Sequence, residues 1–329
     1  MSGEVEFDVG QFEEVWLEKY RPETLDEVLG QDHVVDRLQG YADAEQLPHL
    51  LFAGPAGIGK TTCAIALAKQ MFGDDWGNNF QELNASDERG INTVRTKIKD
   101  FARTAPLGDA EFKIIFLDEA DNLTSDAQAA LRRTMEQYAG TCRFILSCNY
   151  SSRILDPIQS RCTIFRFRPI PDDAIRSMVE RVAKNEGLTI DAEAMEAIEY
   201  IADGDMRRAV NTIQMAASVS TDIDSDVIYE AATAARPEEV EDMVGLALEA
   251  EYLDAREKLD TLLVDQGLSG QDVVKQIHKT LVDAPVDDEL KVRLIDRLGD
   301  TEYRLVMGAN ERVQLEAMLA HFGIAKDEA

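Results

Sequence analysis

A glycine-rich segment that ends in a lysine and a threonine is the part of this 329-residue chain best suited to chemistry. The segment Gly54-Pro55-Ala56-Gly57-Ile58-Gly59-Lys60-Thr61 fits the phosphate-binding pattern G-x-x-x-x-G-K-[ST]. Glycines let backbone N–H groups turn inward around phosphate oxygens, and the N-terminus of the following helix adds partial positive charge. Lys60 would reach the β- and γ-phosphates of a nucleotide, and the Thr61 hydroxyl would hold Mg²⁺. The alternative is a chance glycine turn, which the flanking strand and helix patterns disfavour.

Two acids, Asp118 and Glu119, follow the apolar run Ile114–Leu117. A carboxylate at the C-terminal end of a parallel strand lies where open α/β sheets bind their ligands. We expect Asp118 to bind the Mg²⁺ shell and Glu119 to orient or deprotonate an attacking water. The alternative is an acidic helix N-terminus favoured by the helix dipole, which loses weight beside a phosphate-binding loop.

Three further polar residues flank the predicted strands. Asn149 comes directly after the run Phe144–Cys148, and it fits equally a turn residue and a hydrogen-bond partner of the γ-phosphate or the water. An arginine near the γ-phosphate, such as Arg161 or Arg207, can raise the rate of phosphoryl transfer about 10³–10⁵-fold. Spacing alone does not place either arginine at a nucleotide, so solvated or ion-paired arginines are the alternative.

The elements that must position these residues alternate between short apolar runs and longer helical patterns up to about residue 165. The predicted strands, buried on both faces, are His49–Ala53, Lys113–Leu117 and Phe144–Cys148. The predicted helices between them include Thr61–Met71, Ile91–Thr104 and Ser125–Tyr138. This alternation predicts an α/β domain with a parallel sheet and helices on both faces.

The character of the sequence changes after Phe165-Arg-Phe167. The segment Pro169-Ile-Pro171 is typical of a linker, and beyond it we expect helices and no strand, with a further boundary at Arg236-Pro237. The predicted domains are a nucleotide-binding α/β domain over residues 1–168, a small helical domain over 169–235 and a second helical domain over 236–329.

The net charge is strongly negative, because 34 basic residues face 63 acidic ones and leave −29. Such an excess can indicate disorder, but the 45% apolar fraction and the even spread of the acids favour a folded chain. Taken alone, the charge argues against a nucleic-acid partner, since phosphate binding depends on Lys and Arg. No apolar run reaches the roughly 18 residues of a membrane helix, and the N-terminus lacks signal-peptide features, so we expect a cytoplasmic protein. The four cysteines show neither a C-x-x-C pair nor a His at zinc-ligand spacing.

Together these motifs resemble those of the AAA+ ATPases, and further segments narrow the resemblance to archaeal clamp-loader subunits of the replication factor C family. The resemblance runs from about Val15 to the C-terminus, and its segments occur in the family's order. These segments are Trp16-Leu-Glu-Lys-Tyr-Arg-Pro22, Gly30-Gln31, Asn84-Ala-Ser-Asp-Glu-Arg-Gly-Ile91, Asp118-Glu-Ala-Asp121, Leu131-Arg-Arg-Thr-Met-Glu136, Ser160-Arg-Cys162 and Gly204-Asp-Met-Arg-Arg-Ala-Val-Asn211. Ala56 stands where the family usually has proline, a difference that does not require the backbone to change. The chain shows neither the clamp-binding tail nor the basic extension expected of a large subunit, so the resemblance favours a small one.

The resemblance implies an ATPase that couples ATP binding and hydrolysis to opening a ring-shaped sliding clamp and loading it onto primer–template DNA during replication. It implies a hetero-pentamer of one large subunit with small subunits, in which nucleotide and Mg²⁺ are held between neighbours. Residues 169–235 would then form a helical lid and residues 236–329 an oligomerising collar. The helix that follows Asp121 would meet the clamp.

The resemblance also implies a role for each predicted site residue. Asn149 and Arg207 become the first and second sensors within the subunit, and Arg161 becomes an arginine finger for the neighbouring subunit's ATP. The implied nucleotide-binding set is Arg21 and Val28 on the adenine side, with Gly54, Pro55, Ala56, Gly57, Ile58, Gly59, Lys60, Thr61, Thr62, Asn149 and Arg207. The implied DNA contacts, on or near the helix Ile91–Thr104, are Arg89, Arg95, Lys99 and Arg103. A solvated helix face paired with neighbouring acids is the alternative to those contacts.

Two other functions stay open. A different AAA+ machine, such as a branch-migration motor or a protein-remodelling ATPase, should carry a winged-helix domain or pore-loop aromatics, and the C-terminal sequence shows neither pattern. A scaffold subunit that binds nucleotide without turnover should lack the lysine, the catalytic acid or the finger, but Lys60, Glu119 and Arg161 are all present.

The charge acquires another meaning once DNA is an expected partner. An acidic chain that prefers Arg to Lys is typical of a salt-loving organism. At about 1 M salt the Debye length is only about 3 Å, so an acidic surface scarcely repels DNA beyond contact range. Since salt also weakens phosphate contacts, we expect several subunits to retain the duplex by enclosing it.

Overall fold

The computed structural model describes residues 15–86 and 91–327. The chain divides into two compact units. The first contains Met1–Thr189 and Ile198–Gln214, and the second contains Ile190–Ala197 and Met215–Ala329.

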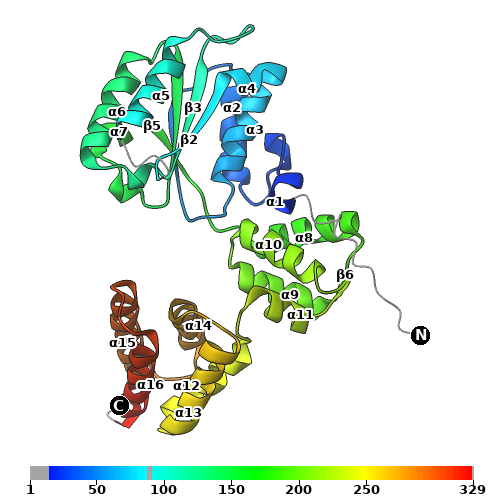
Figure 1. The fold of residues 1–329 in the computed structure, drawn as a ribbon, viewed down its shortest axis with the longest axis vertical. Coiled ribbons are helices and arrows are strands. Elements are labelled where there is room, and N and C mark those ends of the chain that lie inside the picture. The colour runs from blue at the N-terminus through cyan, green and yellow to red at the C-terminus, as the bar shows by residue number, and fades with distance from the viewer. Residues whose placement is uncertain (1–14, 87–90, 328–329) are drawn as a thin grey trace. The chain divides into compact units, whose positions relative to one another are not determined.

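A parallel five-stranded sheet forms the centre of the first unit (Figure 1). Its order is β2-β3-β4-β1-β5, with β1 at His49–Ala53, β2 at Phe80–Asn84, β3 at Lys113–Asp118, β4 at Cys142–Cys148 and β5 at Cys162–Arg166. The central strands are apolar and almost wholly buried, as expected for strands covered on both faces. The edge strands β2 and β5 were not predicted, because both mix buried and exposed positions and neither shows a long apolar run.

The register of the sheet brings the C-terminal ends of its central strands together. Ala53 of β1 pairs with Cys148 of β4, and Leu117 of β3 pairs with Leu146 of β4. The residues that follow these strands therefore leave the sheet at the same edge, which is where ligands bind in open α/β folds.

Helices cover both faces of this sheet (Figure 1). On one face lie α2 (Asp32–Asp43), α3 (Lys60–Phe72) and α4 (Trp76–Asn79), and on the other α5 (Ile91–Arg103), α6 (Ser125–Gln137) and α7 (Asp156–Gln159). Ile98 of α5 and Leu131 of α6 join a buried cluster with Ile115 and Leu146 of the sheet, which explains why those helices carry an apolar stripe. Shorter elements are α1 (Trp16–Lys19) and the 3₁₀ turns η2 (Leu25–Glu27), η3 (Gly73–Asp75), η4 (Ala120–Asn122) and η5 (Ser151–Arg153).

The segment after β5 is largely helical. It contains α8 (Asp172–Glu186), α9 (Ala192–Ala202) and α10 (Met206–Ala217), of which α9 and α10 each have residues in both units. The expectation that no strand follows residue 168 is wrong: β6 (Thr189–Ile190) and β7 (Asp222–Ile223) form a two-stranded sheet. Strands of two residues are too short to show an alternating pattern in the sequence.

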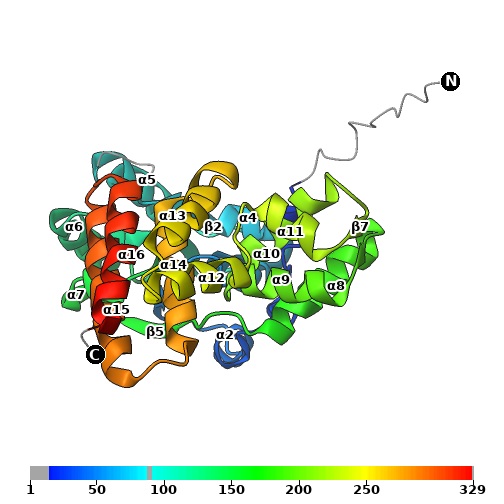
Figure 2. The ribbon, with the colours of Figure 1, turned by 90° about the horizontal axis from the view of Figure 1, so that it is seen from below.

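The rest of the second unit is built from helices (Figures 1 and 2). They are α11 (Ser225–Ala232), α12 (Pro237–Leu248), α13 (Tyr252–Asp260), the π-helical turn η6 (Thr261–Asp265), α14 (Gly270–Asp283), α15 (Asp288–Val306) and α16 (Glu311–Asp327). Leu259, Val273, Ile277, Leu294 and Phe322 belong to one buried apolar cluster that unites α13 to α16. In the part of the chain that the structure describes, no helix has the length and apolar character needed to cross a bilayer.

Candidate nucleotide-binding site

The loop between β1 and α3 holds the side chain of Lys60 in a buried position. Lys60 is 8% exposed, and its Nζ donates hydrogen bonds to the carbonyl oxygen of Gly54 (2.6 Å), to that of Pro55 and to Asn149 Oδ1 (3.1 Å). Burial lowers the pKa of Lys60, while the carboxylates of Asp118 and Asp121 oppose that shift. The lysine therefore lies between the ends of β1 and β4 with its charge stabilised by nearby acids.

The two acids after β3 lie beside this lysine. Thr61 Oγ1 donates a hydrogen bond of 3.3 Å to Asp118 Oδ2, and the backbone N–H of Glu119 donates one of 2.9 Å to Asp118 Oδ1. Glu119 has a φ of 51°, so the chain turns sharply directly after the strand. Asn122 Nδ2 donates to Glu119 Oε2 at 3.1 Å. Because Thr61 and Asp118 present a hydroxyl and a carboxylate oxygen close together, they fit a Mg²⁺ ion, which prefers oxygen ligands.

Asp121 fixes the turn that carries Asn149. This acid is 9% exposed, and its Oδ2 accepts the backbone N–H groups of Asn149 (3.3 Å) and Tyr150 (3.1 Å). The loop after β3 is thus tied to the loop after β4. In the sequence Asp121 is only the last residue of the Asp118–Asp121 motif, and the one signal for this contact is a third acid two residues after Glu119.

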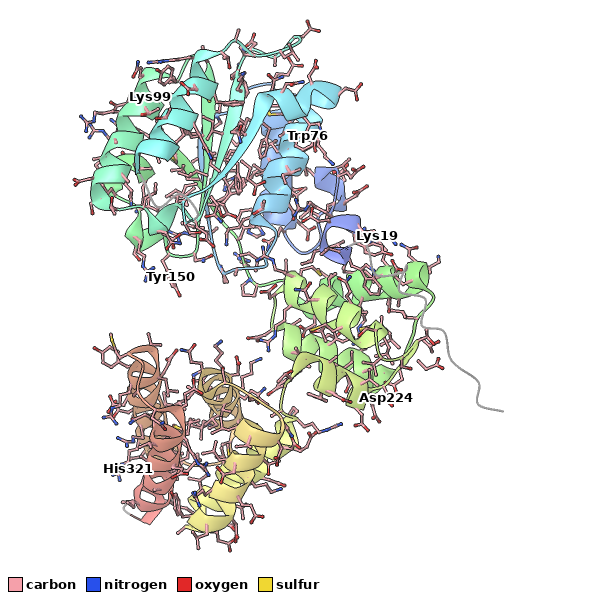
Figure 3. All side chains as sticks on the ribbon, viewed as in Figure 1. Lys19, Trp76, Lys99, Tyr150, Asp224 and His321 are labelled. Carbon is pink, nitrogen blue, oxygen red and sulfur yellow. The ribbon has the colours of Figure 1, made fainter. Side chains whose placement is uncertain are left out.

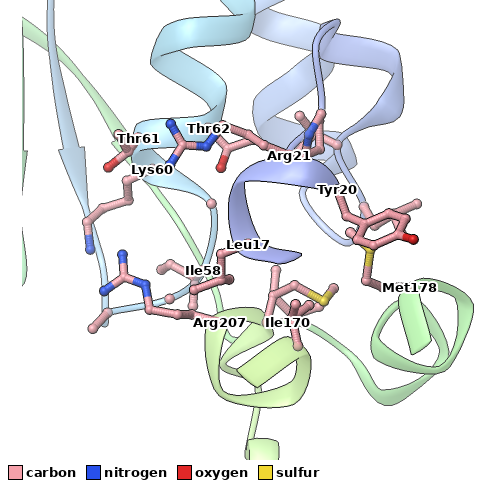
Figure 4. Close-up of a pocket in the computed structure, with 18 of the residues that line it drawn as sticks. Leu17, Tyr20, Arg21, Ile58, Lys60, Thr61, Thr62, Ile170, Met178 and Arg207 are labelled. Atoms are coloured by element: carbon pink, nitrogen blue, oxygen red, sulfur yellow. The ribbon is translucent and has the colours of Figure 1, made fainter. Parts of the chain in front are cut away.

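A cavity of about 380 Å³ opens beside these side chains. Its polar side includes Lys60, Thr61, Asp118, Glu119 and Asn149. Its other side is largely apolar, with Leu17, Tyr20, Ile170 and Met178 (Figure 4), and Val28 and Val210 also line the cavity. This division into a charged part and an apolar part suits a nucleotide, whose phosphates and base differ in the same way.

Most of the predicted nucleotide-binding residues line this cavity. They are Arg21, Val28, Ala56, Gly57, Ile58, Gly59, Lys60, Thr61, Thr62, Asn149 and Arg207. Gly54 and Pro55 are not among the lining residues, and their carbonyl oxygens contact Lys60 instead. Glu82 of β2 also lines the cavity but was not predicted; burial, followed by the charge of Asp118, raises the pKa of its carboxyl group.

The start of α10 contacts the phosphate-binding loop directly. The backbone N–H of Met206 donates to the carbonyl oxygen of Gly57 at 3.0 Å. The next residue, Arg207, lines the cavity on the same side as Lys60 (Figure 4), and its charge contributes to the lowered pKa of that lysine. Two cations therefore lie where the charged part of a nucleotide would be bound.

Arg161 lies away from this cavity. Its Nη2 forms an ion pair of 2.6 Å with Glu136 Oε1, and its Nη1 donates to the carbonyl oxygen of Pro157 at 2.6 Å. The side chain keeps 38% of its surface exposed. The structure does not bring Arg161 to the cavity of its own chain.

The predicted DNA contacts are placed only in part. Arg89 and the side chain of Arg95 lie outside the described residues. Lys99 is half-buried on α5 (Figure 3), and Arg103, one helical turn further on, is exposed and donates from its Nε to Tyr138 Oη at 3.2 Å. Lys99 and Arg103 therefore lie on one side of the helix.

Comparisons with known proteins agree with this architecture. Residues 50–170 match the model of the ATPase family associated with various cellular activities (AAA), and residues 235–321 match the model of the replication factor C C-terminal domain. A replication factor C small subunit from Methanocella arvoryzae is 56% identical over 310 residues, which are 94% of this chain and 96% of that protein. The small subunit from Haloarcula marismortui is 54% identical over 309 residues, covering 94% of each chain.

A solved structure is also similar. The Holliday junction branch migration motor RuvB of Thermotoga maritima has a TM-score of 0.55 at 19% sequence identity, and the match covers 75% of this chain and 91% of that one. At that identity the likeness shows the fold alone.

The fold and the sequence relatives lead to one conclusion. The first unit has the parallel sheet, phosphate-binding loop and paired acids of an AAA+ ATPase, and the C-terminal helices match the domain found in clamp-loader subunits. Since relatives that are more than half identical span 94% of the sequence, the chain belongs to the family of replication factor C small subunits.

Proposed function

We propose that this chain is the ATP-hydrolysing small subunit of a clamp loader, which opens a sliding clamp and loads it onto primer–template DNA. The observation that carries the proposal is the cavity at the C-terminal edge of the sheet, where Lys60, Thr61, Asp118, Glu119 and Asn149 meet. Family membership connects that ATPase site with DNA replication.

Each side chain at the polar end of the cavity has a distinct proposed task. Lys60 exchanges its bonds to the loop carbonyls and Asn149 for bonds to the β- and γ-phosphates. Thr61 and Asp118 hold Mg²⁺, which when bound neutralises phosphate charge. Glu119, released from Asn122, orients or deprotonates the attacking water.

The proposed sensors surround the γ-phosphate from two elements. Asn149 follows β4, and its backbone is fixed by Asp121, so its amide is held at a set position for the phosphate or the water. Arg207 approaches from α10, whose first residue is bonded to Gly57 of the loop. Arg21 and Val28 also line the cavity, and we place the adenine beside them.

The remaining contacts require assembly. We infer that the partners are a replication factor C large subunit and other small subunits in a hetero-pentamer, together with the sliding clamp and DNA. Arg161, which is exposed and remote from its own cavity, acts on the ATP of a neighbouring subunit. Residues 1–168, 169–235 and 236–329 serve as nucleotide-binding, lid and collar domains in this proposal. Arg89, Arg95, Lys99 and Arg103 contact the DNA backbone.

The proposed setting is a cytoplasm of high salt concentration. The net charge of −29 and the excess of Arg over Lys support it. Sequence identity does not bear on this setting, because the relatives from Haloarcula marismortui and Methanocella arvoryzae are 54% and 56% identical to the chain.

An ATPase assay of the chain alone, then with the large subunit, the clamp and primed DNA, across a salt series, tests this function. We expect low activity alone and stimulation only in the complete mixture, with Glu119→Gln as the inactive control. Stimulation by branched DNA without the clamp would favour a branch-migration motor. Nucleotide binding without turnover in every mixture would favour a scaffold subunit.

A further inference from the structure

The segment that leaves β5 for α8 is held along its whole length. We call residues 167–171 the strap. The backbone N–H of Phe167 donates to the carbonyl oxygen of Ala53 at 2.9 Å, and that of Ile170 donates to the carbonyl oxygen of Gly204 at 2.9 Å. Both side chains are 4% exposed. The sequence suggested a linker here, but these contacts make the strap a fixed connection between the phosphate-binding loop and the turn before α10.

Two glycines allow the strap to pass this closely. A Cβ atom at Gly54, the first residue of the phosphate-binding loop, would lie 2.7 Å from the carbonyl oxygen of Phe167. A Cβ atom at Gly204 would lie 2.5 Å from Pro169 Cβ. A side chain at either glycine would therefore displace the strap.

A buried glutamine joins the middle of the strap to the same loop. Gln31 is wholly inaccessible, and its Nε2 donates to the carbonyl oxygens of Arg168 (2.7 Å) and Ile58 (3.2 Å). Its Oε1 accepts the backbone N–H of Arg168 at 3.4 Å. A polar side chain is costly to bury unless its hydrogen bonds are satisfied. Here a single side chain satisfies backbone groups of two segments far apart in the sequence.

The contacts of Gln31 form a continuous path to Arg207. Ile58 is part of the phosphate-binding loop and lines the cavity, and so does Ile170 of the strap. The N–H of Ile170 is bonded to Gly204, three residues before Arg207. A shift of the loop around a phosphate would therefore reach the start of α10 through the strap, in addition to the direct bond from Met206 to Gly57.

We propose that Gln31 is a positioning residue, which couples the phosphate-binding loop to Arg207 through the strap. The inference rests on the proposed function in one respect, that Arg207 contacts the γ-phosphate. It follows that Gln31 contributes more to binding ATP than to binding ADP, although it is not among the residues that line the cavity.

The test measures binding of AMP-PNP and of ADP to the full-length chain in the absence of clamp and DNA. Gln31→Met keeps the side-chain length but makes none of the three hydrogen bonds. We expect AMP-PNP affinity to fall about tenfold or more, the effect of losing one or two net hydrogen bonds, and ADP affinity to fall much less. Gln39→Met is the matched control, because Gln39 lies on α2 and bonds only to Asp43 of the same helix among the described residues.

A double-mutant cycle separates coupling from simple structural support. If Gln31 acts through Arg207, Gln31→Met adds little to the loss of AMP-PNP affinity caused by Arg207→Ala. Equal losses for both nucleotides, or full additivity with Arg207→Ala, would overturn the proposal. If Arg207→Ala itself leaves the preference for AMP-PNP unchanged, the assignment of Arg207 fails first. If the unaltered chain has a normal nucleotide preference but its complete complex does not load a clamp, the result would instead count against the proposed function.

Two further variants cover the case in which Gln31→Met does not fold. Gln31→Glu keeps an acceptor for the Arg168 N–H, and burial beside two carbonyl oxygens favours its protonated form, which can donate to only one of them, so we expect a smaller loss with the same selectivity. Gly204→Ala displaces the strap at its other end. An unchanged preference for AMP-PNP over ADP in folded Gly204→Ala would contradict the proposal.

Discussion

At the scale of single residues, the charged side chains of the cavity are held by partners from other segments. Lys60 is bonded to its own loop and to Asn149, and Asp121 holds the backbone of Asn149. Electrostatic preorganisation of this kind is a principal source of catalytic power, because the dipoles need not reorient during the reaction. Arg161 differs from these residues, because its partners Glu136 and Pro157 hold it away from the cavity.

For Arg161→Ala, we expect ATP binding by the chain to be preserved and stimulated hydrolysis in the assembled complex to fall by about 10³-fold or more. The reason is that Arg161 pairs with Glu136 away from its own cavity, and the proposed function assigns it to the ATP of a neighbouring subunit. The measurements are nucleotide affinity and clamp- and DNA-stimulated turnover. Arg176→Ala, which removes a different exposed ion pair, is the control. Full stimulated activity in Arg161→Ala would show that Arg161 is not the arginine finger.

The residues that sequence reasoning found differ in kind from those it missed. Lys60, Thr61, Asp118 and Glu119 lie in short contiguous motifs whose chemistry can be read from residue type and order. The tasks of Asp121 and Gln31 are different, because each binds backbone groups of segments far away in the chain. Residue type and local spacing carry no information about such partners.

At the scale of elements, β1 and β4 are joined by an unusual contact. The backbone N–H of Phe144 donates to His49 Nδ1 at 3.1 Å, and the two rings meet edge to face. Burial, with a smaller effect of Arg143, lowers the pKa of His49 to about 4 from an ordinary value of 6.5. The neutral imidazole is therefore the form that the folded sheet requires.

This contact predicts a pH dependence of stability. Between pH 4 and 6.5 the unfolded chain binds more protons at His49 than the folded chain, so the free energy of unfolding rises with pH in that window. Between pH 7 and pH 5 we expect the free energy of unfolding to fall by about 2 kcal/mol less in His49→Asn than in the unaltered protein. Asparagine keeps a hydrogen-bond acceptor but does not titrate. Urea unfolding of both proteins at the two pH values measures the difference. Identical losses would show that His49 is not responsible.

Helix α5 carries the second prediction at this scale. For Lys99→Ala combined with Arg103→Ala, we expect weaker DNA binding by the assembled complex and a salt slope shallower by about two units, one per phosphate contact. The control pair is Lys275→Ala with Lys291→Ala on α14 and α15, which should leave the slope unchanged. An unaltered salt slope in the α5 variant would show that Lys99 and Arg103 belong to a solvated helix face and do not contact DNA.

The central strands and the helices with apolar stripes followed from the sequence more readily than the sheet edges. β1 begins and ends at the predicted residues, and α5 and α6 are within one residue of prediction at each end. β2 and β5 were not predicted, because each pairs with a strand on one side only and is not fully buried. Their sequences therefore lack a continuous apolar run. Edge positions follow from the strand order, which short-range patterns do not encode.

At the scale of the whole molecule, the charge of −29 predicts a dependence of stability on salt. Repulsion among like charges destabilises a compact state, and salt screens it. We expect the free energy of unfolding to rise as KCl increases from about 0.1 M to about 1 M. Sucrose strengthens burial without screening charge, so comparison with sucrose isolates the electrostatic part. A protein that is most stable at low salt would contradict the proposed setting.

The hydrogen bonds of Lys60 have a consequence for nucleotide binding and release. Because the oxygens of Gly54, Pro55 and Asn149 compete with phosphate oxygens for the same ammonium group, nucleotide entry and departure are exchanges of partners. A leaving product does not strand a buried cation, which would otherwise cost several kcal/mol. This internal competition lowers the affinity for every nucleotide and favours product release, because the ammonium group gains protein partners as the phosphates leave.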